Sequence, residues 1–187
     1  MDGKIAALNA AGFIEWFDVG PQEREGYVYE FSYSGSKFRK VARLEGGSLH
    51  WGLVDGDGHE TLPCRFDELM YNGGVVRVKE NGLWGLMAPD GKRLTPSVYD
   101  SAFAEYSNGL CAVQRKELWG FVNLQGKEVI SCRYDALTDF DGERSMVLLN
   151  EKYGFIDTES REVTPLMYYM AYPFSEGLVA VRECQRN

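Results

Sequence analysis

Histidine and cysteine are the residue types in this chain best suited to acid–base, nucleophilic or metal chemistry, and there are only two histidines and four cysteines. A catalytic group built on His59 would need Asp55 or Asp57 to orient the imidazole, and a serine or cysteine from elsewhere as nucleophile. The run DGDGHE at 55–60 is a poor calcium loop, because such a loop carries glycine at its sixth place, where Glu60 stands. A solvated hairpin turn is the simpler interpretation, so no catalytic residue and no metal ligand is predicted.

The cysteines do not form a metal-binding pattern. They are Cys64, Cys111, Cys132 and Cys184, with no Cys-x-x-Cys pair and no histidine at ligand spacing. Cys64 and Cys132 each fall thirteen residues after a tryptophan, so we expect them in equivalent, partly buried positions as free thiols, which suits a reducing compartment. No glycine-rich loop follows a strand and opens a helix. The sequence therefore predicts no cofactor.

An internal repeat is the dominant feature of the chain. An aromatic residue followed by glycine recurs at Trp51, Trp84, Trp119 and Tyr153, in steps of 33, 35 and 34 residues. Such a period indicates an array of small supersecondary units, each of which buries its apolar face against its neighbours. Arrays of this kind more often bind partners than catalyse reactions.

Several positions recur within the repeat, counted from the aromatic residue as zero. Glycine stands at position seven, proline at twelve, an aromatic at fifteen, aspartate at sixteen, and a further glycine in the following connection. The position-seven glycines are Gly58, Gly91 and Gly126; the prolines are Pro63, Pro96 and Pro165; the aromatics are Phe66, Tyr99, Tyr134 and Tyr168; the aspartates are Asp67, Asp100 and Asp135; the later glycines are Gly74, Gly109, Gly142 and Gly177. The fourth copy has Tyr153, Ser160 and Tyr169 at positions zero, seven and sixteen, which suggests a terminal unit.

One period is predicted to form a three-stranded antiparallel meander. Residues 110–115, 119–123 and 127–130 are rich in alternating, β-branched or aromatic residues and are separated by polar segments of three to five residues. Glycine at position seven supplies the positive φ of a hairpin, so Ser160 should cost the fourth hairpin stability. Proline at position twelve is expected to end the third strand. The position-zero and position-fifteen aromatics are expected to fill the core.

This pattern resembles the WG-repeat family, also called KWG repeats. The resemblance rests on WGLMAPDGK (84–92), WGFVNLQGK (119–127) and FSEGLVAV (174–181), and it runs from Trp51 to the C-terminus. It implies a repetitive β scaffold that occurs in many bacterial proteins, usually without an assigned activity, and it transfers no catalytic residue. The predicted class is all-β: tandem meanders of about 34 residues, stacked as an array or closed as a small propeller-like ring.

Residues 1–50 fit the pattern less well. A unit starting at Ile5 would place its turn at Asn9 and Gly12, and residues 27–33 alternate like a strand, so this region is either a degenerate copy or begins with a short helix over residues 4–11. If the start supplied two strands of a unit and residues 178–183 the first strand, the joined ends would close a ring and remove exposed sheet edges. An open solenoid is the alternative.

Length and composition favour one domain over residues 1–187. Within it we divide a degenerate unit at 1–50 from repeats at 51–83, 84–118, 119–152 and 153–187. A chain of this length buries roughly 70% of the surface of its unfolded state, enough for a continuous core. No apolar run approaches the roughly 18 residues of a membrane span, and the N-terminus is a poor signal peptide, so we expect a cytoplasmic protein.

The charge balance points to a class of partner. Twenty basic and 28 acidic residues give a net charge of −8, which disfavours direct binding to nucleic acid or anionic membranes. Acids gather between the third strand of one unit and the first strand of the next, where they could form one negative surface for a basic protein. The predicted partner-binding residues are Asp67, Glu68, Asp100, Glu105, Tyr106, Asp135, Asp139, Asp141, Glu143 and Glu176. An aspartate at position sixteen is also expected to cap its own loop.

We therefore expect a non-enzymatic β-repeat protein that presents an acidic face to another protein. A sharper hypothesis is an immunity protein that neutralises a basic bacterial toxin by covering its active cleft. Two alternatives remain open. One is a glycan- or peptide-binding module that uses Trp16, Phe17 and Tyr106 as exposed platforms; the other is a hydrolase with a pocket where carboxylates and His59 converge. The partner's identity and the oligomeric state do not follow from the sequence.

Overall fold

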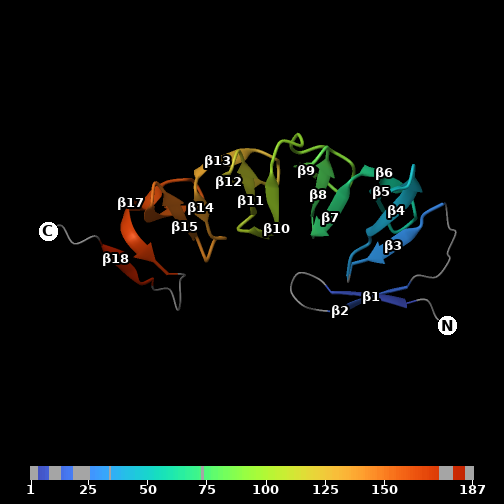
Figure 1. The fold of residues 1–187 in the computed structure, drawn as a ribbon, viewed down its shortest axis with the longest axis horizontal. Coiled ribbons are helices and arrows are strands. Elements are labelled where there is room, and N and C mark those ends of the chain that lie inside the picture. The colour runs from blue at the N-terminus through green and yellow to red at the C-terminus, as the bar shows by residue number, and fades with distance from the viewer. Residues whose placement is uncertain are drawn as a thin grey trace. The chain divides into compact units, whose positions relative to one another are not determined.

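The computed structural model describes residues 4–8, 14–18, 26–33, 35–72, 74–172 and 179–183, and within 4–8, 14–18 and 103–107 it describes the backbone alone. Every regular element in these residues is a β-strand, and neighbouring strands pair antiparallel (Figure 1). The all-β prediction is therefore confirmed. The chain divides into two compact units, one formed by Met1–Gly82 with Met87–Arg93 and the other by Leu83–Leu86 with Leu94–Asn187. A single domain, and the choice between array and ring, stay predictions.

The strands follow one another in chain order within each sheet. A hairpin joins β1 (Lys4–Leu8) to β2 (Ile14–Asp18), and the first full sheet contains β3 (Tyr29–Ser32), β4 (Arg39–Glu45), β5 (Ser48–Val54) and β6 (Glu60–Phe66). The next contains β7 (Glu68–Asn72), β8 (Val75–Glu80) and β9 (Leu83–Met87), followed by β10 (Ser101–Ser107), β11 (Leu110–Arg115), β12 (Leu118–Asn123) and β13 (Glu128–Tyr134). The last contains β14 (Ala136–Leu137), β15 (Arg144–Leu149), β16 (Lys152–Asp157), β17 (Glu162–Ala171) and β18 (Val181–Glu183).

The predicted meander is present, but a strand was missed. The segment after position sixteen, expected to be a loop, forms a strand of its own: β7, β10 and β14 each pair with the strand that follows them. Trp119 therefore lies on β12, the third strand of a four-stranded sheet. The sequence repeat begins in the middle of a sheet, so its boundaries and those of the sheets are out of phase.

The aromatic residues at positions zero and fifteen are cross-strand partners. Trp51 pairs with Phe66 and Trp119 with Tyr134. The position-fifteen ring is the buried member: Phe66, Tyr99 and Tyr134 are 0%, 3% and 1% exposed, whereas all four position-zero aromatics are half-buried. Core packing is thus confirmed for the first three position-fifteen rings, and the tryptophans cover the edge of that core.

The glycine after each aromatic is needed because the backbone of the partner strand lies very close to it, and not because its φ is unusual. A Cβ built on Gly52 would lie 2.6 Å from the carbonyl oxygen of Leu62, and one on Gly120 would lie 2.7 Å from the amide nitrogen of Cys132. The strand register shifts at this point in β5–β6 and in β12–β13, which marks a β-bulge. Any side chain here would push the bulged strand away, and this explains the invariant Trp-Gly or Tyr-Gly pair within the chain.

Glycine at position seven does require positive φ, as predicted. Gly58, Gly91 and Gly126 have φ of 91°, 91° and 80°, and Ser160 adopts the same left-handed conformation with φ of 67°. In this conformation a residue with a Cβ is less stable than glycine by about 1 kcal/mol. The expected weakness of the fourth hairpin therefore has a structural basis.

Proline at position twelve does not end the third strand, which corrects our prediction. Pro63 lies within β6 and Pro165 within β17, both at the register shift. A residue in a bulge need not donate to the ladder, so proline is tolerated there. In the second repeat this strand is reduced to the isolated bridges Trp84–Tyr99 and Met87–Arg93.

The hairpin before the position-zero aromatic has a tighter loop than the three to five residues expected. Its loop has two residues: Lys116 and Glu117 have φ of 53° and 65°, and Asn150 and Glu151 have φ of 50° and 61°. Two successive positive φ values define a type I′ turn, which matches strand twist but suits Asn-Gly better than Lys-Glu. These turns therefore need support from neighbouring groups.

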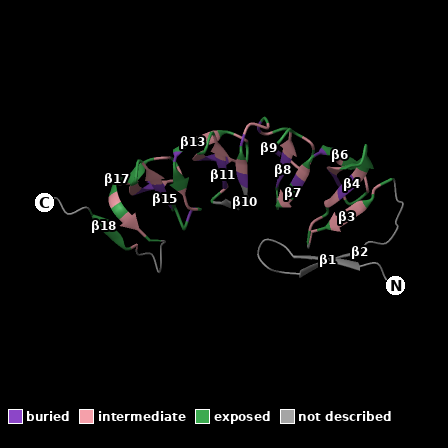
Figure 2. Cartoon of the chain, viewed as in Figure 1, coloured by how far each residue is buried: buried purple, intermediate pink, exposed green. Residues whose placement is uncertain are grey.

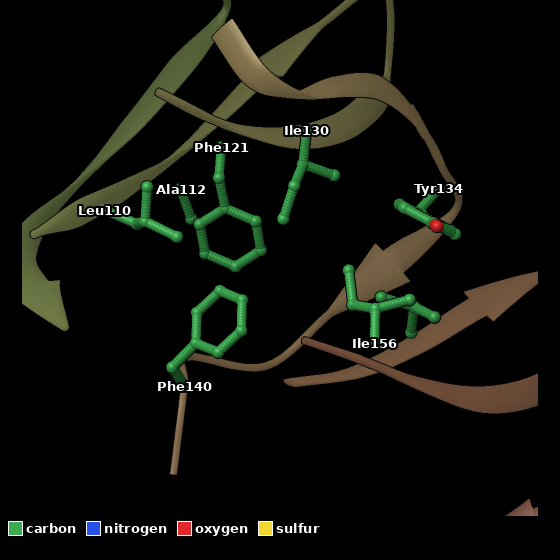
Figure 3. Packing of buried hydrophobic residues seen from close by; sticks show 8 residues of the cluster. Leu110, Ala112, Phe121, Ile130, Tyr134, Phe140 and Ile156 are labelled. Atoms are coloured by element: carbon green, nitrogen blue, oxygen red, sulfur yellow. The ribbon is translucent and has the colours of Figure 1, made fainter. Parts of the chain in front are cut away.

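A buried cluster fills each unit. In the second unit it comprises Leu110, Ala112, Phe121, Ile130, Tyr134, Phe140, Val147 and Ile156. The rings of Phe121 on β12 and Phe140 on the connection between β14 and β15 face each other with centroids 4.9 Å apart (Figure 3). In the first unit the cluster comprises Leu53, Leu62, Phe66, Leu69, Val76, Val78 and Met87. Sheets within a unit thus share one core, as expected for repeats that shelter one another.

The N-terminal region begins with a strand, so the helix alternative is wrong. In β1–β2, Leu8 pairs with Ile14 across five connecting residues. Val54 pairs with Glu60 and Val122 with Glu128 across equally long connections in the repeats. The hairpin is compatible with a degenerate copy of the repeat, and that interpretation of residues 1–50 stays a prediction. The turn at Asn9 and Gly12 lies outside the described residues.

Candidate interaction surface

Aspartate at position sixteen supports the tight turn that precedes the position-zero aromatic of the next repeat. The backbone N–H of Lys116 donates to the Asp100 carboxylate at 2.6 Å, and that of Asn150 donates to Asp135 at 2.8 Å. The aspartates' own N–H groups donate to the carbonyls of Gln114 and Leu148. Both carboxylates thus hold the first residue of a strained type I′ turn. Asp100 and Asp135 therefore brace a turn, but it is the turn of the following hairpin and not their own loop, which corrects the prediction.

The first unit shows a related arrangement around Asp67. This exposed residue donates its N–H to the carbonyl of Lys79, and the following turn is Asn81-Gly82, the pair best suited to type I′ geometry. The neighbouring Glu68 forms an ion pair of 2.6 Å with Lys79. The charge of Glu68 is therefore balanced within the molecule, which weakens the attraction that this carboxylate could exert on a basic partner.

Three of the predicted acids lie on or next to one exposed turn in the second unit. Asp139, Asp141 and Glu143 are all exposed. The turn itself is closed by backbone bonds between Asp141 and Arg144. Because all three residues are exposed, this segment presents negative charge to solvent. We call Asp139, Asp141 and Glu143 the acidic turn (exposed residues are green in Figure 2).

Three predicted contact residues cannot be placed. Glu105 and Tyr106 lie on β10, but their side chains are outside the described part of the structure, and Glu176 lies outside it altogether. The side chains of Trp16 and Phe17 on β2 are likewise not described. The glycan- or peptide-binding alternative, which depends on these aromatic residues, stays a prediction.

The turn around His59 has the geometry of a structural turn. Asp55 Oδ1 accepts the backbone N–H groups of Asp57 and His59 at 3.0 and 2.9 Å, and His59 Nδ1 lies 3.5 Å from Asp55 Oδ2. The hydrogen bond from the His59 backbone is the main reason that the pKa of Asp55 is lowered. Ligand atoms of these three residues lie within 4.8 Å of one another.

The same bonds recur without a histidine in other repeats. Asn123 Oδ1 accepts the N–H groups of Gln125 and Lys127, and Asp157 accepts those of Glu159 and Arg161. Position eight is otherwise basic, occupied by lysine or arginine. The turn thus explains the cluster at His59 without an ion, and the cluster by itself does not define a metal site.

The two repeat-equivalent cysteines occupy equivalent places, as predicted. Cys64 Sγ lies 4.0 Å from the carbonyl oxygen of Val41, and Cys132 Sγ lies 3.8 Å from that of Val113. Both are free thiols, as is Cys111. Burial raises the pKa of Cys64 to about 11 and that of Cys132 in the same direction, so these thiols are poor nucleophiles near neutral pH.

A feature that sequence reasoning missed is an apolar row on the outer face of β17. Val163, Met167 and Tyr169 are 41%, 42% and 59% exposed, and their side chains alternate with half-buried ones along the strand. Continuous alternation with apolar residues on the outer face was the available signal. Among the described residues no helix is long and apolar enough to cross a membrane.

The fold and these motifs define a tandem β-repeat protein. A family model described as "WG containing repeat" matches residues 51–84, 84–119, 119–153 and 153–183, and the chain belongs to this family. A comparison with curated protein sequences finds no match.

Solved structures give a weaker likeness. Hsv2 from Kluyveromyces lactis aligns with a TM-score of 0.45 and 9% identity, covering 87% of this chain and 57% of that one. The CNH domain titled AfRom2 aligns with a TM-score of 0.33 and 10% identity, covering 94% and 68%. The chain spans little more than half of the first of these.

Proposed function

We propose that this chain is a non-enzymatic protein-binding module whose acidic turn contacts a basic protein. The observation that carries the proposal is the division among its exposed acids. Asp100 and Asp135 are engaged by backbone N–H groups and Glu68 by Lys79, whereas the acidic turn places three exposed acidic residues close together in the chain. With a net charge of −8, such a turn would attract a cationic surface and orient it.

The sharper form of the proposal is neutralisation of a basic bacterial toxin in the cytoplasm. A repeat scaffold supports this role because it offers an extended surface that can cover a cleft. A neighbouring toxin-like reading frame in the genome would favour it.

Affinity capture from the native host tests the proposal. The parent chain should retain a basic protein that is released progressively by salt, because charge-driven contacts are screened. Capture of nucleic acid, or of a basic protein regardless of salt, would contradict it.

A charge-matched pair of variants separates the acidic turn from overall charge. Asp139→Asn/Asp141→Asn/Glu143→Gln should lose most of the capture. Asp57→Asn/Glu117→Gln/Glu151→Gln removes three exposed acids elsewhere and should retain it. Equal losses in the two variants would show that net charge, rather than this turn, drives binding.

A further inference from the structure

Two hairpins of this chain are closed by the same dipeptide in the same kind of turn. Asn81-Gly82 lies between β8 and β9, and Asn108-Gly109 lies between β10 and β11. Both asparagines have φ of 53°, and the glycines have φ of 79° and 72°, which fits a type I′ turn. Leucine follows each pair, so the local sequence Asn-Gly-Leu is identical. A difference in chemistry between the two pairs should therefore come mainly from the surrounding structure.

Asparagine followed by glycine is the dipeptide most open to deamidation, because glycine has no side chain that hinders attack by its own backbone nitrogen. That nitrogen attacks the side-chain carbonyl carbon of the asparagine. A new C–N bond forms, the bond to the side-chain amide nitrogen breaks, and ammonia leaves with the proton of the glycine N–H. Water then opens the resulting succinimide ring to give aspartate or isoaspartate.

Both turns have room for this reaction. Asn81 and Asn108 are exposed, and a Cβ built on Gly82 or Gly109 would meet no atom within 4 Å. Neither glycine N–H donates a hydrogen bond to another described residue. The attacking nitrogen is therefore available in both hairpins once the turn opens locally.

The two asparagine side chains differ in what holds them. Asn108 Nδ2 donates a hydrogen bond to the backbone carbonyl of Gly142, in the connection between β14 and β15. The Asn81 side chain has no hydrogen-bond partner among the described residues. Because the side chain must swing toward the following nitrogen to react, Asn108 has to break a bond that Asn81 does not make.

The Asn81 turn also lacks a brace that equivalent turns possess. At the corresponding turns before the next two repeats, the first N–H donates to the carboxylate of Asp100 or Asp135. The carboxylate of Asp67, which stands at the same position of the first repeat, accepts no hydrogen bond from another described residue. Local opening of the Asn81 turn should therefore be comparatively easy.

We propose that Asn81 is a site of spontaneous deamidation in the folded protein and that it converts faster than Asn108. The expected difference is about fivefold, the factor that one ordinary hydrogen bond contributes to an opening equilibrium. Asn72-Gly73 is a third such pair, but Gly73 lies outside the described part of the structure, so the comparison uses the other two.

The two products should affect the hairpin differently. Aspartate keeps the length of the backbone, suits a type I′ turn and adds one negative charge. Isoaspartate carries the main chain through the side-chain carbon, so the connection between β8 and β9 becomes one atom longer. Because a two-residue loop fixes how its strands pair, isoaspartate at this position should weaken the pairing of β8 with β9.

Incubation of the full chain in mildly alkaline buffer, followed by trypsin digestion and mass spectrometry, measures both conversions. Trypsin separates the two pairs, because Lys92 and Arg93 lie between them. In the native protein Asn81 should convert about fivefold faster than Asn108. In urea the two rates should become similar, because the local sequence is the same. Equal rates in the native protein, faster conversion of Asn108, or an Asn81 that converts only in urea would overturn the proposal.

Two variants at the same position separate the reaction from its consequence. Asn81→Gln keeps an amide on a longer side chain that closes the ring less readily, so it should stop conversion in this peptide and leave the rate at Asn108 unchanged. Asn81→Asp reproduces one product and should have the thermal midpoint of the parent. An aged parent sample enriched in isoaspartate should melt at a lower temperature than Asn81→Asp. An equal midpoint would reject the expected effect on the β8–β9 hairpin.

Discussion

The third repeat (119–153) and the fourth (153–183) form the same meander but differ in how far it is covered and in the residue at position sixteen. Their position-zero and position-fifteen aromatics pair in the same register. Tyr134 is 1% exposed, however, whereas Tyr168 is only half-buried, and the third repeat's Asp135 is replaced by Tyr169. The strand pairing of the meander is thus retained in the fourth repeat, whereas the burial of the position-fifteen ring and the position-sixteen aspartate are not.

The largest expected contrast is at position fifteen. Tyr134→Ala should lower the free energy of unfolding by about 3 kcal/mol, because it leaves a cavity in a closed core. Tyr168→Ala should cost about half as much, since part of that ring already faces solvent. Urea unfolding followed by tryptophan fluorescence measures both. Equal losses would mean that the two sheets are equally well covered.

Position seven gives the next contrast. Gly126→Ser should destabilise by about 2 kcal/mol, because the residue needs positive φ and its Cβ would press on the Leu94 carbonyl. The reverse change, Ser160→Gly, should stabilise by about 1 kcal/mol. Thermal unfolding of the two single variants is the measurement. A destabilised Ser160→Gly would show that the serine makes a compensating contact.

Position sixteen should have a smaller effect. Asp135→Ala removes the acceptor for the Asn150 N–H and should cost about 1 kcal/mol. Asp141→Ala, which removes an exposed carboxylate of the acidic turn, is the control and should change stability by less than about 0.5 kcal/mol. If both changes were neutral in chemical unfolding, the aspartate would not support the type I′ turn.

The smallest contrast is in pH dependence. Desolvation opposes ionisation of Asp157, but hydrogen bonds from the Arg161 side chain and backbone and from the Glu159 backbone lower its pKa overall. Its stabilising contribution is therefore present above the unfolded-state pKa of about 4 and is lost as pH falls through the lower folded-state pKa. Asp157→Asn, which copies Asn123, should flatten this part of the stability profile between about pH 5 and 2. An unchanged profile in unfolding experiments would contradict the assignment.

Repetition made much of the fold predictable. Four copies aligned on Trp51, Trp84, Trp119 and Tyr153 revealed the period, and the turn at position seven followed from its glycines. The strand after position sixteen escaped prediction because it can be as short as the two residues of β14, too short to show an alternating pattern. Proline at position twelve was wrongly predicted to end the strand. A β-bulge removes the need for a backbone N–H there, and a bulge cannot be recognised from the sequence of one strand alone.

The candidate surface was less predictable from sequence. Asp135 and Asp141 look alike in composition, and only the fold shows that one carboxylate holds a turn while the other lies on a turn closed by backbone bonds. Likewise, alternation along β17 indicates two faces, but only the fold shows that Val163, Met167 and Tyr169 lie on the exposed one.

The amino-acid sequence by itself determined the β class, the repeat length and the residues that need a left-handed or side-chain-free backbone, because these are local demands that recur every 34 residues or so. Tertiary structure decided which strand of a sheet each repeat begins on, which acids are engaged and which apolar residues stay exposed. Those outcomes depend on what packs against each strand. The sequence of a strand does not show which neighbouring segment covers it.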